Sequence, residues 1–181
     1  MSMEQLLVGG IAALLFFWVL GAHNRVVALR SAIGAAWLQV DAALQQRAAA
    51  VAALLSGLRL HLPQQQDKLD AVLVAQSRVQ AAADTMRPRP THAAHAQSLL
   101  QADASLTDAL ASVSVLFDTH EALREDEALA ARLAVLHEAT PRLAFARQLF
   151  NDAARVYNAA ARQFPTRLLS RLFGFAPAGE L

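Results

Sequence analysis

The first part of the chain carries an unbroken apolar segment. Residues 6–22 read LLVGGIAALLFFWVLGA, and no ionisable side chain lies between Glu4 and His23. A helix of about 18 apolar residues rises about 27 Å, close to the thickness of a hydrocarbon core. The segment therefore predicts a transmembrane helix. A cleaved signal peptide is one alternative, although residues 1–5 contain no Lys or Arg, and a buried core helix is the other.

A helical seam follows this segment. Apolar side chains recur at alternating steps of four and three residues, the period of an amphipathic or coiled-coil helix. They are Ile33, Trp37, Val40, Leu44, Val51, Leu54 and Leu58, with Arg47 in the same register. Nothing between Ala22 and Val26 breaks a helix, so we expect one long helix from the span to Leu62, ended by Pro63.

The same period predicts three further helices, at about 67–86, 92–120 and 129–164. The last keeps the alternation over five heptads, and Pro141 inside it is expected to kink the helix near His137. Short connections imply antiparallel neighbours. The expected fold class is all-α: an N-terminal transmembrane helix that continues into an antiparallel, up-down helical bundle with long helices.

Composition supports this class and excludes several functions. Alanine and leucine, both strong helix formers, supply 71 of the 181 residues. The absence of Cys excludes a disulfide framework, a Cys-ligated zinc site and a thiol nucleophile. A formal net charge of +1 gives no general attraction to nucleic acid, so no nucleic-acid partner is expected.

The sequence offers no pattern typical of catalysis. His92 and His95 are three residues apart, but no carboxylate lies within four residues, so a surface pair is favoured over a metal site. No serine lies in a nucleophile turn, and no glycine-rich phosphate loop is present. We expect no enzymatic activity, no cofactor and no metal.

Charges beside the span predict its orientation. No Lys or Arg precedes it, whereas Arg25 and Arg30 follow it closely. The positive-inside rule then places residues 1–5 outside and the helical part in the cytoplasm. Trp18 lies near the cytoplasmic end of the span, where an amphipathic ring suits the membrane interface.

Two groups of short motifs resemble the LemA family. The first comprises Asn24-Arg25-Val26-Val27-Ala28-Leu29-Arg30, Ala36-Trp37, Asp41 and Leu44. The second comprises Ala146-Arg147, Phe150-Asn151, Tyr157-Asn158, Phe164-Pro165 and Phe173-Gly174-Phe175. The resemblance covers about residues 20–176. Phe150 stands where the family usually has Tyr, and residues 63–91 match poorly.

The resemblance implies a single-pass protein of the bacterial inner membrane with a cytoplasmic helical bundle. It brings no settled reaction. Members are often encoded near membrane metallopeptidases or other envelope proteins, which suggests such a peptidase as a partner. The implied organisation is a short N-terminus at 1–5, a span at 6–22, a LemA-like bundle at 23–164 and a tail at 165–181.

One charged pair is expected inside the bundle. Arg147 lies in the seam of the last helix and Asp41 lies beside the seam of the first. An antiparallel register that places Phe164 at the depth of Val26 brings the two together, and a buried pair of this kind can determine helix register. In the alternative, both side chains extend to water. Arg47 has no partner by the same register, so we expect it at the rim.

The tail combines apolar and basic residues without an acid over residues 165–175. Its Arg167, Arg171, Phe173 and Phe175 suit an anionic membrane surface, where the last helix should return. The same residues suit packing against the base of the bundle, and the two interpretations are compatible.

These patterns predict a non-enzymatic structural or adaptor scaffold at the membrane. The long helices leave apolar faces that one chain does not cover, which predicts self-association as well as contact with membrane lipids. The alternative function is membrane remodelling or lipid binding by the basic tail.

Overall fold

The computed structural model describes residues 3–164, 167 and 176–181. Its helices are α1 (Met3–His61), the 3₁₀ turn η1 (Pro63–Gln65), α2 (Gln66–Met86), α3 (Ala93–Thr119), α4 (Glu121–Arg124) and α5 (Glu127–Arg162). In this part of the chain, the one β-type pairing is an isolated bridge between His92 and Ala178. The expected all-α class is confirmed.

The ends of the helices follow from local sequence. α1 stops directly before Leu62-Pro63, as expected, because proline lacks the N–H that a helix needs. The N-cap of α5 is Asp126, whose carboxylate accepts hydrogen bonds from the backbone N–H groups of Ala128 (2.8 Å) and Leu129 (3.0 Å). The short helix α4 lies in the connection between α3 and α5.

Proline 141 does not interrupt α5. The helix runs without a break from Glu127 to Arg162 with Pro141 inside it. One residue earlier, the Thr140 hydroxyl donates to the Leu136 carbonyl at 3.2 Å. The kink expected near His137 stays a prediction.

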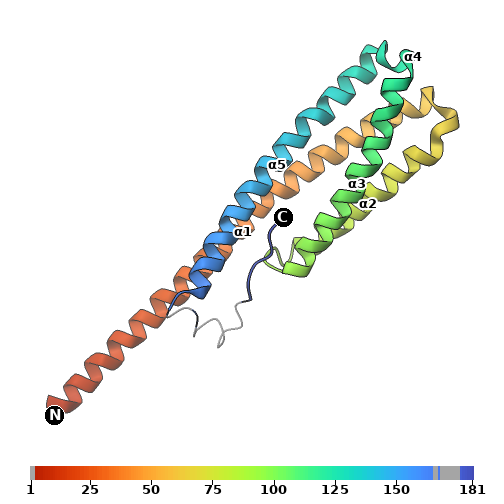
Figure 1. Ribbon diagram of the computed structural model, residues 1–181. Helices are drawn as coiled ribbons and strands as arrows, with labels where there is room; N and C mark the ends of the chain where they lie inside the picture. The colour runs from red at the N-terminus through yellow and green to blue at the C-terminus, as the bar shows by residue number, and fades with distance from the viewer. Residues whose placement is uncertain (1–2, 165–166, 168–175) are drawn as a thin grey trace.

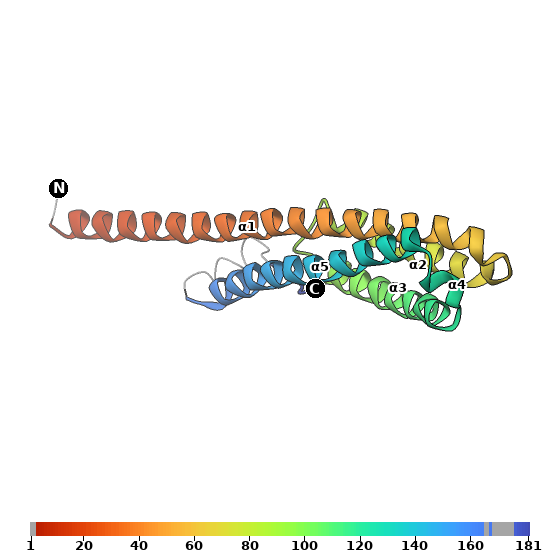
Figure 2. The ribbon, with the colours of Figure 1, turned by 90° about the horizontal axis from the view of Figure 1, so that it is seen from above.

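The helices form two antiparallel pairs. α1 packs along α5, α2 packs along α3, and α1 meets α2 over a shorter stretch (Figure 1). The α2–α3 hairpin lies beside the half of the α1–α5 pair that is farther from the N-terminus, and Figure 2 shows α1 extending well beyond it. The hairpin therefore begins some distance below the apolar segment.

The predicted seam is the core of the α1–α5 pair. Ile33, Leu54 and Leu58 are fully buried, and each such side chain contributes about 1.5–3 kcal/mol relative to exposure. Trp37 and Phe150 are also buried and meet edge to face, with ring centroids 6.2 Å apart. This geometry suits the opposite charges of ring face and ring edge.

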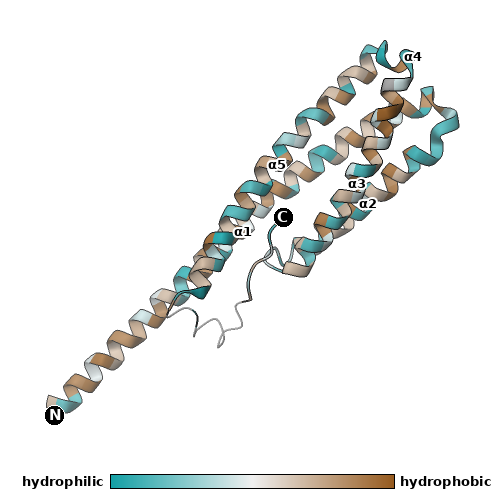
Figure 3. Cartoon of the chain, viewed as in Figure 1, coloured by the Kyte–Doolittle hydropathy of each residue, from teal (hydrophilic) through white to brown (hydrophobic). Residues whose placement is uncertain are grey.

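The described part of the chain leaves most of the apolar segment uncovered. Its most apolar window of 18 residues is 0% buried, and α1 is the one helix among the described residues that is long and apolar enough to cross a membrane. Figure 3 shows this end of α1 coloured mostly as hydrophobic. A core helix would bury one face, so the core-helix alternative does not fit.

Candidate functional site

The last turn of the apolar segment meets the end of α5. The rings of Trp18 and Phe164 lie 5.4 Å apart, although both stay largely exposed at 43% and 73%. Asn24 and Arg25 follow on the exposed surface of α1. Two aromatic rings and basic side chains thus gather where the apolar segment ends, a composition typical of a membrane–water interface.

Three charged side chains from three helices meet inside the bundle. Asp103 of α3 is 8% exposed, and its two carboxylate oxygens face two arginines. Arg47 of α1 donates to Oδ1, and Nη2 of Arg147 from α5 lies 2.9 Å from Oδ2. We refer to Arg47, Asp103 and Arg147 as the ion cluster. It holds two positive charges and one negative charge in a place that water hardly reaches.

The expected Asp41–Arg147 pair is wrong. Asp41 instead accepts two hydrogen bonds of 3.1 Å from Nε and Nη2 of Arg87, and Arg147 faces Asp103. The reason is that the α2–α3 hairpin lies against α1 and α5 and supplies a nearer partner to each. The hydrogen bond from Arg87 to Asp41 is the main cause that raises the Arg87 pKa above its ordinary value.

The expected rim position of Arg47 is also wrong. This residue is 5% exposed and belongs to the ion cluster. Its partner Asp103 was missed, although a signal was present in the sequence. Asp103 continues the alternating steps of four and three residues that Leu99 and Leu106 keep in α3. A charge in an apolar seam indicates a buried partner of opposite charge. Arg47, Asp103 and Arg147 each lie in the apolar seam of a different helix.

The residues of the C-terminal family motifs bind the end of the described chain. We refer to residues 176–181 as the strap. The Asn158 side chain donates to the Ala178 carbonyl at 3.0 Å and accepts from the Ala178 N–H at 2.8 Å. Asn151 does the same for Leu181, at 2.5 and 2.6 Å. The two asparagines are two turns apart, so one face of α5 holds an extended backbone.

The strap also contacts the residues at the start of α3. The N–H of Gly179 donates to the Thr91 carbonyl at 3.3 Å. A Cβ on Gly179 would lie 2.7 Å from the Cα of Ala93, so this close approach requires glycine. The Tyr157 hydroxyl donates to the Ala176 carbonyl at 3.1 Å, and burial raises the pKa of this hydroxyl. The strap therefore joins α5 to α3.

Most of the expected membrane-binding tail lies outside the described residues, namely Pro165, Arg171, Phe173, Gly174 and Phe175. Arg167 is described and exposed, and its backbone N–H donates to the Gln163 carbonyl at 2.8 Å. The strap, by contrast, packs on the bundle, with Ala178 only 6% exposed.

The histidine pair lies where the hairpin turns into α3. The rings of His92 and His95 are stacked with centroids 4.2 Å apart. Among the described residues, no group of three His, Cys, Asp or Glu side chains is arranged to hold a metal ion.

Comparison with protein-family models gives a match. The model of the LemA family matches residues 36–181. The match includes the ion cluster, both strap-binding asparagines and the strap, whereas the apolar segment precedes it. No curated protein matches the chain.

Proposed function

Because the chain belongs to the LemA family and carries an uncovered apolar helix, we propose that it is a non-enzymatic scaffold of the bacterial inner membrane. In this proposal residues 6–22 span the bilayer, residues 1–5 lie outside, and the helical bundle lies in the cytoplasm. The scaffold presents its helical faces to a second copy of the chain, or to another envelope protein such as a peptidase.

The continuity of α1 carries the proposal. The helix passes from the uncovered segment into the buried seam without a break, from Met3 to His61. Residues 23–61 add roughly 58 Å of rigid helix at about 1.5 Å per residue. A rod of this kind holds a docking surface at a defined distance from the membrane, which suits an adaptor better than a freely tethered domain.

Exposed apolar side chains support self-association. Between the apolar segment and the hairpin, α1 exposes Val27 at 44% and Leu38 at 68%. On α5, Phe145 and Val156 are 61% and 53% exposed. Each pair is about three turns apart and therefore lies on one helix face. Exposed apolar faces on both helices favour contact with another helix.

The membrane placement can be tested with single cysteines, because the natural sequence has none. Gln64→Cys lies in the turn after α1, and Gln5→Cys lies before the apolar segment. A membrane-impermeant maleimide should label Gln5→Cys in intact spheroplasts and should label Gln64→Cys only after permeabilisation. Labelling of Gln64→Cys in intact spheroplasts would show that the orientation is opposite to the proposed one. Release of the protein from washed membranes would contradict the proposed transmembrane helix.

Self-association can be tested on the intact protein in a mild detergent at micromolar concentration. Sedimentation should show an oligomer that the double variant Leu38→Ser/Phe145→Ser converts to monomer. The control is Leu60→Ser/Val115→Ser, which removes two equally exposed apolar side chains elsewhere. A monomeric native protein, or equal behaviour of the two double variants, would contradict the proposed interface.

A further inference from the structure

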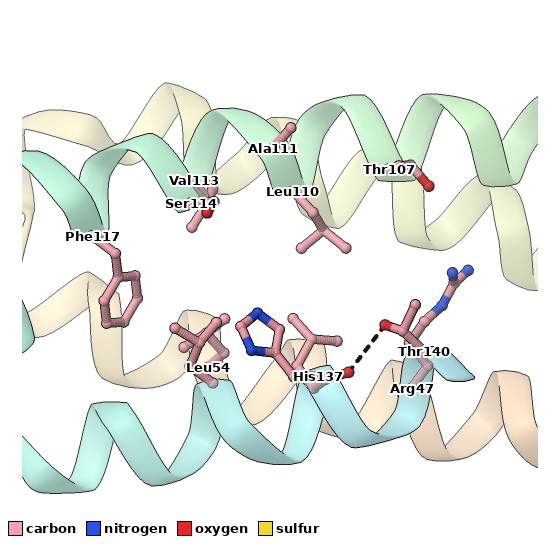
Figure 4. Close-up of a pocket in the computed structure, with 12 residues that line it drawn as sticks. Arg47, Leu54, Thr107, Leu110, Ala111, Val113, Ser114, Phe117, His137 and Thr140 are labelled. Carbon is pink, nitrogen blue, oxygen red and sulfur yellow. Dashed lines mark hydrogen bonds between the residues drawn. The ribbon is translucent and has the colours of Figure 1, made fainter. Parts of the chain in front are cut away.

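An apolar cavity adjoins the ion cluster. It lies between α3 and α5 over α1 and has a volume of about 270 Å³. Figure 4 shows side chains from both helices pointing into it, with Arg47 at one end. Leu54, Leu110, Val113 and Phe117 form much of its wall. The volume is near the lower limit of small-molecule sites, about 300 Å³.

The charge beside the Arg47 end of the cavity is not balanced within the ion cluster. Arg47 lines the cavity, and behind it the guanidinium groups of Arg47 and Arg147 share the single carboxylate of Asp103. Nε of Arg147 is buried and has no hydrogen-bond partner among the described residues. One excess positive charge therefore lies in a medium of low polarity, where an anion is stabilised strongly.

The remaining polar groups are few. The hydroxyls of Thr107 and Thr140 face the cavity but donate to carbonyls of their own helices. His137 enters from the α5 side (Figure 4). Ser114 adds a further hydroxyl, and the other lining side chains are apolar. A molecule that fills the cavity therefore needs one charged end and a hydrocarbon body.

We propose that this cavity binds an amphipathic monocarboxylate with a medium-length acyl chain. The carboxylate pairs with Arg47 and balances the ion cluster, because a guanidinium binds a carboxylate through parallel hydrogen bonds. The acyl chain lies along Leu110, Val113 and Phe117. One excess charge matches a monoanion, whereas a phosphate dianion would require further donors that the cavity wall does not supply.

The experiment uses the intact protein in detergent and octanoate below its micellar concentration, with a protein-free detergent blank. Calorimetry should show saturable binding at one site per chain. Octanol, which has the same chain without the charge, should bind at least about tenfold more weakly, and octylammonium should not bind. Equal binding of octanoate and octanol would overturn the proposal.

Two variants make the test specific to the cavity. Ala111→Trp places a large ring at the cavity and leaves the ion cluster intact, so octanoate binding should be lost. Ala104→Trp adds the same ring to an exposed position of α3 that does not line the cavity and should bind octanoate normally. Equal affinities for the two variants would show partition into detergent rather than binding at this site.

The charge is tested separately. Arg47→Gln should reduce the affinity for octanoate at least about tenfold while leaving that for octanol unchanged. If circular dichroism shows that Arg47→Gln does not fold, the Ala111→Trp and Ala104→Trp pair still decides the outcome.

Discussion

The α1–α5 pair and the α2–α3 hairpin are both antiparallel helical pairs, but different contacts hold each in place. α1 and α5 share a long apolar seam that includes Trp37 and Phe150. The hairpin has its own apolar seam, yet it meets α1 over a shorter stretch. The two pairs share one apolar core, and polar contacts also join them: the ion cluster, the Arg87–Asp41 pair and the strap.

Apolar and polar contacts contribute differently to this fold. Apolar burial has no direction, so it assembles helices into pairs without fixing how one pair lies on the other. Hydrogen-bonded charges need a defined geometry. In this chain they occur where α3 and the end of α2 meet α1 and α5, and we expect them to determine the position of the hairpin.

The largest effect is expected from Asp103→Ala. The substitution leaves the buried Arg47 and the largely buried Arg147 without a counter-charge, which should lower the free energy of unfolding by about 3–5 kcal/mol. Urea unfolding of the intact protein in detergent, followed by circular dichroism, measures it. The control is Asp108→Ala, which removes an exposed carboxylate from the same helix. If Asp103→Ala and Asp108→Ala lowered the free energy of unfolding by similar amounts, the ion cluster would not be what positions the hairpin.

A smaller effect is expected from Asn158→Ala. The variant removes both hydrogen bonds to Ala178 and leaves its part-buried backbone groups without their partner, a loss of about 1–3 kcal/mol. Limited proteolysis should then cleave near the strap faster than in the native protein. The matched variant is Asn24→Ala, at an exposed asparagine of α1. An unchanged cleavage rate in Asn158→Ala would mean that other contacts hold the strap.

Asp41→Ala should have a still smaller effect. Its partner Arg87 is 41% exposed, so water and salt screen the ion pair, and the expected loss of stability is smaller than that of Asn158→Ala. The difference in melting temperature from the native protein should shrink as salt rises from low to high ionic strength. If Asp41→Ala lost as much stability as Asp103→Ala, the Arg87–Asp41 pair at the end of α2 would position the hairpin at least as strongly as the ion cluster does.

The smallest effect concerns the far end of the α1–α5 pair. Hydrogen bonds from the backbone N–H groups of Leu129 and Ala128 hold the pKa of Asp126 below its ordinary value, and His61 and Arg132 lower it further. A lowered folded-state pKa means that Asp126 stabilises the fold above the pKa of the unfolded chain, about 3.9, and that this contribution is lost as pH falls through the folded-state value.

Asp126→Asn tests this point, because asparagine also caps helices but carries no charge. The native protein should melt at a slightly higher temperature than the variant at neutral pH, and the two should converge as the pH is lowered below about 3.9. A difference that persists at acid pH would assign the effect to the shape of the side chain rather than to its charge.

Much of the fold could be predicted from the sequence because helix formation and helix faces are local. The apolar segment at 6–22, the seam through Trp37 and the stop at Pro63 each depend on neighbours within a turn or two. The long first helix and the all-α class followed directly. The short helix α4 was not predicted, because four residues are too few to show a period.

The partners of the charged residues could not be predicted in the same way. Periodicity placed Arg147 in the seam and Asp41 beside it, but neither position says which of three neighbouring helices comes closest. The family motif residues Tyr157 and Asn158 were recognised as a pattern, while their bonds to the strap depend on a chain segment about 20 residues away.

The sequence by itself determined where helices form, which faces are apolar and which segment has the length and apolarity to cross a membrane, since these depend on side chains a few residues apart. The tertiary structure alone decided that Arg47, Asp103 and Arg147 meet and that Asp41 turns to Arg87. The physical reason is that a charge pairs with whatever opposite charge the packing brings within a few ångströms, and the packing is set by the whole chain.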